Sequence, residues 1–228
     1  MDTNKNSYTI IYSIVMVVLV AAVLAFVSLS LKDKQNENIS NEKKQYLLAS
    51  VGLGADANFD QVITEAIVVD GNGNVVNTAT SNIAASEAFN ISTSEQASLI
   101  KDGAPKEELR LPVFVATLPD GSQAYIFSAY GAGLWGPIWG WVSLKTDLNT
   151  ISGVKFDHSG ETPGLGAKIS EGQSHFVTQF QGKNPGDPNF KFAVKKDGGS
   201  FDAITASTIT SRAYIDVLNN AYNAFLNI

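Results

Sequence analysis

The feature that most restricts the fold of this chain is a long apolar run near its amino terminus. From Tyr8 to Leu31 the sequence reads YTIIYSIVMVVLVAAVLAFVSLSL and contains no charged residue. At about 1.5 Å of rise per residue, a helix of this length exceeds the ~30 Å hydrocarbon core of a bilayer. A cleaved signal peptide is the alternative, but its apolar region is much shorter and a clear A-x-A cleavage site is missing. We therefore predict a membrane-spanning anchor.

The remainder of the chain is long enough for one well-buried domain. We expect an amino-terminal tail over residues 1–7, a transmembrane helix over 8–31, a polar juxtamembrane linker or helix over 32–48, and a folded domain over 49–228. Four lysines at positions 32, 34, 43 and 44 follow the span, whereas only Lys5 precedes it. By the positive-inside rule this count favours a cytoplasmic domain.

Composition excludes several kinds of function. The net charge is -6 and the folded part has no Lys/Arg cluster, which argues against nucleic acid as a partner. The chain has no cysteine, so it cannot supply thiolate ligands, disulfides or a cysteine nucleophile, and with only two histidines we predict no metal site. Redox chemistry would have to come from an organic cofactor or from a neighbouring subunit.

The pattern of apolar and turn residues predicts an α+β domain with an antiparallel sheet and flanking helices. Two short strands are expected on either side of a tight turn at Asp70–Gly73, followed by a helix near residues 94–101. Strands are then expected at 111–118, 123–130, 138–145 and 151–157. Further along we predict a short amphipathic helix at 174–183, a strand at 191–196 and a closing helix at 209–227.

A glycine-rich segment from Gly131 to Gly136 formally matches the G-x-G-x-x-G dinucleotide motif. Pro137 follows at once, and the next residues have strand character instead of opening a helix. We therefore favour a glycine-rich connection between strands. Trp135, Trp139 and Trp141 could wall a planar ligand, although tryptophans more often belong to a core.

Two later segments carry polar groups suited to a ligand. The loop His158–Gly166 combines a carboxylate, hydroxyls and three glycines, and is typical either of a structural turn or of a ligand loop. No G-x-S-x-G elbow supports a hydrolase. The segment Asp202–Ser211 is rich in hydroxyls ahead of the last helix, where it could cap the helix or place a phosphate at its amino terminus.

Together, and in this order behind one span, these segments resemble the C subunit of the Na+-translocating NADH:quinone oxidoreductase. The motifs stand here as GAGLW at 131–135, HSGETPGLG at 158–166 and DAITASTITS at 202–211. The resemblance implies a domain of the FMN-binding type and covalent FMN, held through its phosphate on Thr208. It implies a cofactor-binding set of Thr208, Trp135, Glu161, Thr162, Gly164, Leu165, Asp202, Thr205, Ser207, Ile209 and Thr210, with Trp135 and the loop residues as ring neighbours and no catalytic or metal residue.

The acceptor motif departs from the family at two positions. Ala206 and Ser207 stand where Gly and Ala are usual. We expect Ala206 to be tolerated if its φ angle is negative. Counting from Asp202 places Thr208 at the acceptor position, Thr205 in the family's S/T slot, and Thr210 in the helix start, where it can act as a cap.

The resemblance also implies a function and a location. The chain would relay electrons from NADH toward quinone inside a six-subunit complex of the bacterial inner membrane. Its domain would lie in the periplasm, where a Mg-dependent flavin transferase attaches the flavin; we prefer this placement to the one that the lysine count favours. One alternative is the homologous G subunit of the ion-translocating ferredoxin:NAD+ oxidoreductase. The other is an anchored binding module without flavin.

Overall fold

The computed structural model describes residues 6–226, so most of the predicted tail and the last residue of the predicted closing helix, Asn227, lie outside the described residues. The chain separates into two compact units, one ending at Lys43 and the other beginning at Lys44. The apolar run and the folded domain are therefore described separately.

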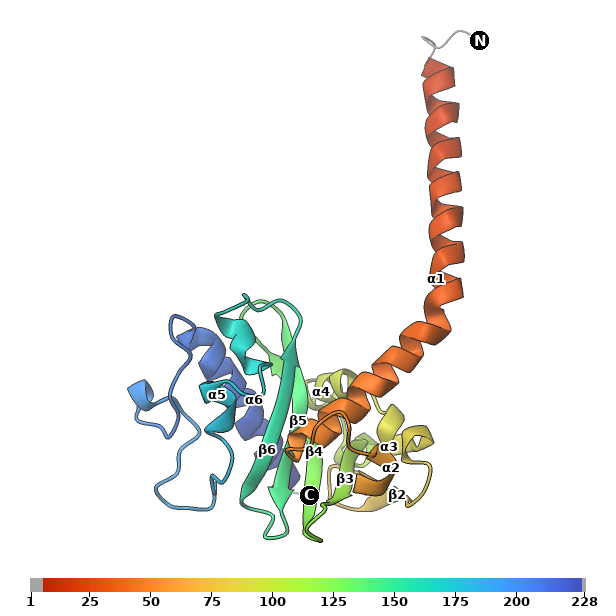
Figure 1. Ribbon diagram of the computed structural model, residues 1–228. Coiled ribbons are helices and arrows are strands. Elements are labelled where there is room, and N and C mark those ends of the chain that lie inside the picture. The colour runs from red at the N-terminus through yellow and green to blue at the C-terminus, as the bar shows by residue number, and fades with distance from the viewer. Residues whose placement is uncertain (1–5, 227–228) are drawn as a thin grey trace. The chain divides into compact units, whose positions relative to one another are not determined.

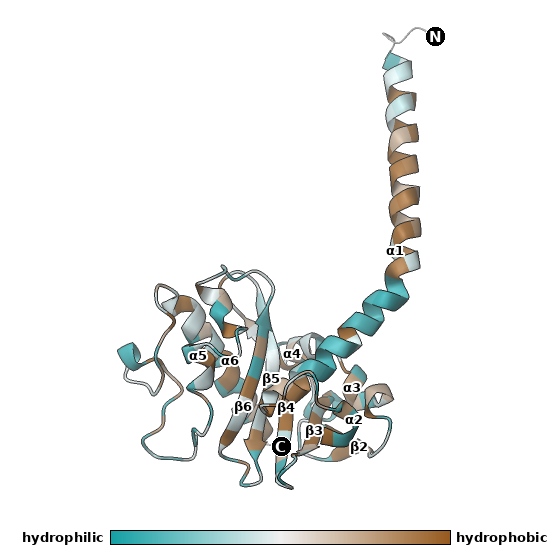
Figure 2. Cartoon of the chain, viewed as in Figure 1, coloured by the Kyte–Doolittle hydropathy of each residue, from teal (hydrophilic) through white to brown (hydrophobic). Residues whose placement is uncertain are grey.

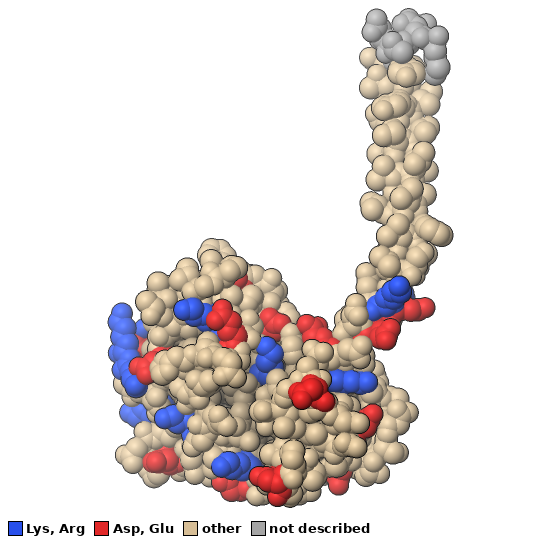
Figure 3. Space-filling view, in the orientation of Figure 1, with Lys and Arg blue, Asp and Glu red and all other residues tan. Residues whose placement is uncertain are grey.

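Helix α1 runs from Asn6 to Ser50 and contains the apolar run. Figure 2 shows an apolar stretch followed by a hydrophilic one, and in the described part of the helix Figure 3 shows charged side chains after the apolar stretch. Its most apolar 18-residue window has a mean hydropathy of 3.0, and among the described residues this is the one helix long and apolar enough to cross a membrane. Within the apolar run, the Ser30 hydroxyl donates to the Phe26 carbonyl at 2.8 Å, which satisfies it without water.

A six-stranded antiparallel sheet forms the centre of the second unit (Figure 1), as the sequence predicts. Its strands lie in the order β2-β1-β3-β4-β5-β6. Every neighbouring pair is antiparallel, and β3 to β6 follow one another as a meander. The strands are β1 (Ile63–Val69), β2 (Val75–Ala79), β3 (Leu111–Thr117), β4 (Gln123–Ala132), β5 (Pro137–Lys145) and β6 (Ile151–His158).

Helices cover both faces of the sheet because alternate strand residues are apolar on both sides. On β4, Ile126 belongs to one apolar cluster and Phe127 to the other. The first cluster includes Leu47 and Leu48 at the end of α1, and the second includes most buried side chains of the last helix. The remaining helices are α2 (Phe59–Val62), α3 (Glu87–Asn90), α4 (Thr93–Lys101), α5 (His175–Thr178) and α6 (Thr208–Leu226), with 3-10 turns at Ile83–Ala85, Lys106–Glu108, Gly166–Ile169 and Lys195–Asp197.

Two predicted elements differ in the structure. The predicted strand at 191–196 is wrong: Val194 makes a single bridge to Phe201, and a 3-10 turn begins at Lys195. Val194 is buried in the core, and the alternating apolar pattern reflects this packing of a loop. The predicted helix at 174–183 is reduced to the single turn of α5, after which Gln179 turns its side chain toward the backbone of Asp202.

The hydroxyl of Tyr214 is the one buried side-chain polar atom without a hydrogen-bond partner in the described part of the chain. Tyr214 is fully buried among aromatic rings, and this burial raises the pKa of its phenol well above the usual range. An unsatisfied buried hydroxyl costs about 1–3 kcal/mol. We therefore expect Tyr214→Phe to raise the free energy of unfolding by about 1 kcal/mol in urea titrations.

Tyr222 provides the matched control for this substitution. Its hydroxyl donates to Asn149 Oδ1 at 2.6 Å, so Tyr222→Phe should lower the stability by about 1 kcal/mol. A loss of stability in Tyr214→Phe would contradict the prediction and would indicate an ordered water bound to that hydroxyl.

Candidate functional site

Glu161 joins the three sequence motifs at one point. Its Oε1 atom accepts the backbone N–H groups of Leu134 at 3.0 Å and Trp135 at 3.2 Å, and its Oε2 atom accepts the Thr210 hydroxyl at 2.9 Å. The side chain is buried, with Glu161 only 5% exposed. We call this carboxylate and its three donors the Glu161 cluster. Glu161 as a neighbour of a flavin ring stays a prediction, and its carboxylate binds three groups of the protein itself.

The glycine-rich segment is the turn between β4 and β5. Gly133 donates its N–H to the Gly136 carbonyl at 2.8 Å, and β5 begins at Pro137, so the dinucleotide reading is excluded and the strand connection is confirmed. This turn packs closely on the loop at 158–166. A Cβ atom on Gly136 would lie 2.0 Å from Ser159 Oγ, and one on Gly160 would lie 2.7 Å from the Trp135 carbonyl oxygen.

The loop at 158–166 presents its central residues to solvent while its ends are fixed. His158 Nδ1 accepts the N–H of Glu161 at 3.2 Å, and a Cβ atom on Gly166 would lie 2.3 Å from Glu161 Oε2. Glycine at 166 is therefore required for the loop to close over the carboxylate. Between these anchors Thr162, Gly164 and Leu165 are exposed.

The segment at 202–211 contains a tight turn that leads directly into α6. Ser207 N–H donates to the Ile204 carbonyl at 3.0 Å, and the Ser211 hydroxyl accepts the N–H of Ile204 and donates to the Ser207 carbonyl, both at 2.9 Å. Ala206 occupies the third position of this turn with a φ of 61°. The condition under which we expect Ala206 to be tolerated without strain, a negative φ, is therefore not met. A positive φ at the third position of a turn favours glycine, because alanine in this region is strained.

The three threonines of the segment differ in how their hydroxyls are placed. Thr210 is buried and its hydroxyl is bonded to Glu161, so it does not act as the helix cap that we expected. Thr205 is exposed within the turn. Thr208 is half-buried and is the first residue of α6, a helix of 19 residues. A phosphoryl group on Thr208 would lie at the positive end of a long helix.

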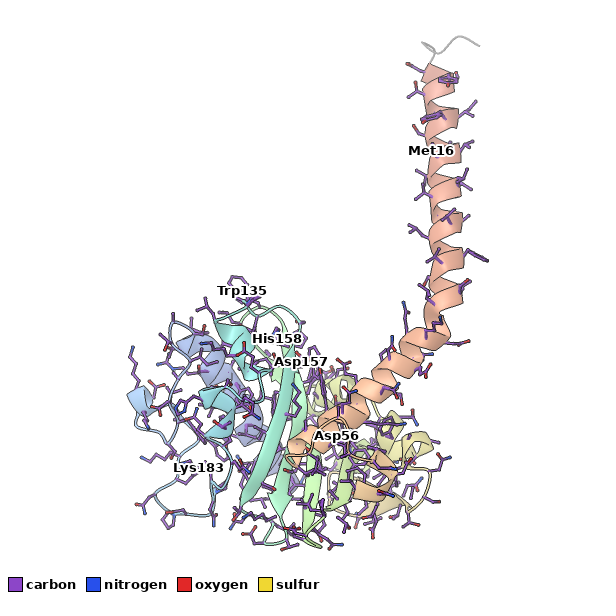
Figure 4. The ribbon with its side chains drawn as sticks, viewed as in Figure 1. Met16, Asp56, Trp135, Asp157, His158 and Lys183 are labelled. Carbon is purple, nitrogen blue, oxygen red and sulfur yellow. The ribbon has the colours of Figure 1, made fainter. Side chains whose placement is uncertain are left out.

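Large apolar side chains project into solvent around the Glu161 cluster. Trp135 is 65% exposed at the tip of the β4–β5 turn, and Figure 4 shows it pointing away from the body of the unit. Ile209, beside Thr208, is 59% exposed, and Leu134 and Leu165 are also exposed. Trp141, in contrast, is buried against Phe114. The arrangement fits a planar ligand, because apolar and aromatic surface lies beside the start of α6.

Asp202 lies apart from the Glu161 cluster. Lys195 Nζ donates to its carboxylate at 2.7 Å, and His175 Nε2 lies 3.5 Å away. The hydrogen bond from Lys195 lowers the pKa of Asp202 below its usual value. Gln179 fixes the backbone of Asp202 on both sides, with hydrogen bonds of 2.7 and 2.9 Å. Sequence reasoning missed Gln179, because no local pattern links it to a residue 23 positions away.

The strained residue Ala206 yields a stability prediction. A non-glycine residue in the left-handed region costs roughly 1–2 kcal/mol. Part of this cost is offset because alanine at this position gives the unfolded chain less conformational entropy than glycine would. We expect Ala206→Gly to raise the free energy of unfolding by about 1 kcal/mol, measured by urea titration.

Ala203 is the control, because it belongs to the same segment and has an ordinary backbone conformation. Ala203→Gly should destabilise the protein. Equal effects of the two substitutions would show that the backbone at Ala206 carries no strain.

Comparison with known proteins extends these observations. The profile of the FMN-binding domain family matches residues 133–223. A crystal structure of the C subunit of Na(+)-translocating NADH-quinone reductase from Parabacteroides distasonis is 34% identical, covers 86% of this chain and 96% of that chain, and superposes with a TM-score of 0.69.

Two curated relatives differ in how much of the chain they match. The C subunit of Na(+)-translocating NADH-quinone reductase from Neisseria meningitidis serogroup B is 29% identical over 92% of this chain and 87% of its own length. The G subunit of the ion-translocating oxidoreductase complex from Salmonella typhi is 39% identical, but over 48% of this chain and 47% of its own length. The chain thus matches about half the length of that G subunit.

Proposed function

Because the chain belongs to the family of the C subunit of Na(+)-translocating NADH-quinone reductase, we propose that it is a membrane-anchored flavoprotein that relays electrons through covalent FMN. Relatives of this chain are subunits of ion-translocating oxidoreductase complexes. We place the chain in a Na+-translocating NADH:quinone oxidoreductase of six subunits, with the FMN phosphate esterified to Thr208.

The observation that carries the proposal is the placement of the Thr208 hydroxyl. Thr208 is the first residue of α6 and is only half-buried, whereas the Thr210 hydroxyl is buried and bonded to Glu161. A transferase can reach the first hydroxyl and not the second. The free N–H groups of the helix start then stabilise the negative charge of a phosphodiester.

The attachment is a phosphoryl transfer from FAD. The Thr208 oxygen forms a bond to the flavin-side phosphorus, the anhydride bond between the two phosphates breaks, AMP leaves, and the hydroxyl proton is released. We propose that Asp202, Thr205 and Ser207 belong to the motif that the transferase recognises. Their positions support this, because the turn at 204–207 and the two hydrogen bonds of Gln179 to Asp202 fix the segment that leads into Thr208.

Bound FMN would supply one- and two-electron redox chemistry, which no side chain of this protein provides. The chain would orient the cofactor and shield it from water. Thr208 tethers it, and the exposed residues Trp135, Thr162, Gly164, Leu165 and Ile209 are our candidates for contacts with the ring. Glu161 and Thr210 support these contacts from beneath, through the Glu161 cluster.

The experiment that tests this function is a denaturing gel of the full chain, purified from cells that express the flavin transferase. Covalent flavin fluoresces under ultraviolet light, whereas an anchored binding module without flavin gives a dark band. Peptide mass spectrometry should find the mass of FMN less one water on the fragment that contains Thr208. A dark band would overturn the proposal.

The G subunit of an ion-translocating ferredoxin:NAD+ oxidoreductase is the second candidate, because the relative of the G type has the higher local identity. The match to the C subunit covers far more of the chain and therefore favours the quinone reductase. Purification through a tag on this chain, followed by identification of the co-purifying subunits, distinguishes the two complexes.

We propose that the anchor crosses the bacterial inner membrane once and that the domain lies in the periplasm. Helix α1 supports the single span by its length and composition. The need for an exported flavin transferase supports the periplasmic placement of the domain. A reporter enzyme that works only after export, fused after Ile228, should be active. Activity of a cytoplasm-specific reporter at the same position would place the domain on the opposite side.

A further inference from the structure

The last turns of α1 make a specific polar contact with the sheet. Tyr46 donates its hydroxyl to Asp157 Oδ2 on β6, across 111 positions of sequence. The other carboxylate oxygen of Asp157 accepts the N–H of His158 at 2.7 Å. Figure 4 shows Asp157 and His158 next to one another on β6, below the turn that carries Trp135. Asp157 thus joins α1 to the beginning of the loop at 158–166.

The hydrogen bonds continue from His158 into the Glu161 cluster. His158 Nδ1 accepts the backbone N–H of Glu161, and the Glu161 carboxylate holds Leu134, Trp135 and Thr210. An unbroken series of hydrogen bonds and short covalent links therefore runs from Tyr46 to the β4–β5 turn and to Thr210, two residues after Thr208. The series ties together segments that lie far apart in the sequence.

Tyr46 is itself held in a defined position. Its neighbours Leu47 and Leu48 are buried in the core, and Ser143 Oγ donates to the Ser50 carbonyl at 2.5 Å. Lys155 Nζ lies 5.0 Å from the centre of the Tyr46 ring and also donates to the Ser170 carbonyl at 2.8 Å. The phenol therefore has little freedom to seek another partner, and its hydroxyl restrains Asp157.

We propose that Tyr46 is a positioning residue for the site: through Asp157 and His158 it fixes the loop that carries Glu161, and thereby the β4–β5 turn with Trp135. The end of the anchor helix and the candidate cofactor site then form one hydrogen-bonded unit. The proposal deepens the function given above but rests only on contacts of the protein, so it can be tested without flavin.

The test is Tyr46→Phe in the full chain, reconstituted in lipid nanodiscs and prepared without the flavin transferase. This substitution removes one oxygen and keeps the ring under Lys155. Because Leu134 and Trp135 donate their amide hydrogens to Glu161, their hydrogen exchange reports on the cluster. We expect both amides to exchange roughly three- to tenfold faster in the variant, while the amide of Val142 in the centre of β5 stays unchanged.

Tyr125→Phe is the matched control, because Tyr125 lies on β4 outside this series of hydrogen bonds, and it should leave the exchange of Leu134 and Trp135 unaltered. Asp157→Asn is a second variant: it weakens the acceptor for Tyr46 and should accelerate the same two amides. Unchanged exchange at Leu134 and Trp135 in both variants, or equal acceleration at Val142, would overturn the proposal. Failure of flavin attachment in wild type would overturn the proposed function and leave this result intact.

Discussion

Thr208→Ala is expected to abolish covalent flavin completely. The substitution removes the hydroxyl that we propose attacks the phosphate, and no remaining hydroxyl of the segment occupies the same place at the start of α6. On a denaturing gel the variant should give a dark band where wild type fluoresces. Thr208→Ser keeps a hydroxyl on the same carbon and should retain part of the fluorescence.

The other two threonines are the controls for this result. Thr205 is exposed in the preceding turn, so Thr205→Ala should still carry flavin on Thr208, although recognition by the transferase can suffer. Thr210→Ala removes a donor from the Glu161 cluster and should lower the fraction of protein that carries flavin, without moving the attachment point. Fluorescence that persists in Thr208→Ala, or a flavin peptide that maps to Thr205, would show that the acceptor motif is shifted in this chain.

The fold was predictable where local pattern and burial agree. All six strands lie close to their predicted positions, because alternate apolar residues and a tight turn such as the one at Asp70–Gly73 are local signals. The prediction of a strand at 191–196 is wrong because Val194 and its aromatic neighbours pack into the core from a loop. This packing produces the same alternation of apolar and polar residues as a strand.

The site was only partly predictable. The three motifs named the segments of the candidate site, and the structure brings these segments together through Glu161. The roles of individual residues depend on contacts between distant segments, such as Tyr46 with Asp157 and Gln179 with Asp202, and no local spacing encodes them. The positive φ of Ala206 likewise could not be predicted from its residue type, because alanine usually adopts a negative φ.

Glu161→Ala is expected to have the largest effect on stability. The substitution leaves the N–H groups of Leu134 and Trp135 and the hydroxyl of Thr210 without their acceptor, and it opens a small cavity beside Gly166. Losses of this kind cost about 1–3 kcal/mol for each buried group, and partial access of water lowers the sum. We expect a decrease of about 3–5 kcal/mol in the free energy of unfolding, measured by urea titration, together with little flavin attachment.

Glu161→Gln separates the shape of the cluster from its charge. The amide oxygen can still accept from Leu134 and Trp135, and the amide nitrogen can donate to Thr210 if that hydroxyl reverses its direction. Only the charge-assisted part of the three hydrogen bonds is then lost, so the free energy of unfolding should decrease by about 1 kcal/mol. Most of the flavin should remain attached. If Glu161→Ala were as stable as Glu161→Gln, the carboxylate would not hold the three motifs together. The exposed Trp135 and the start of α6 at Thr208 would then have to be positioned independently of each other.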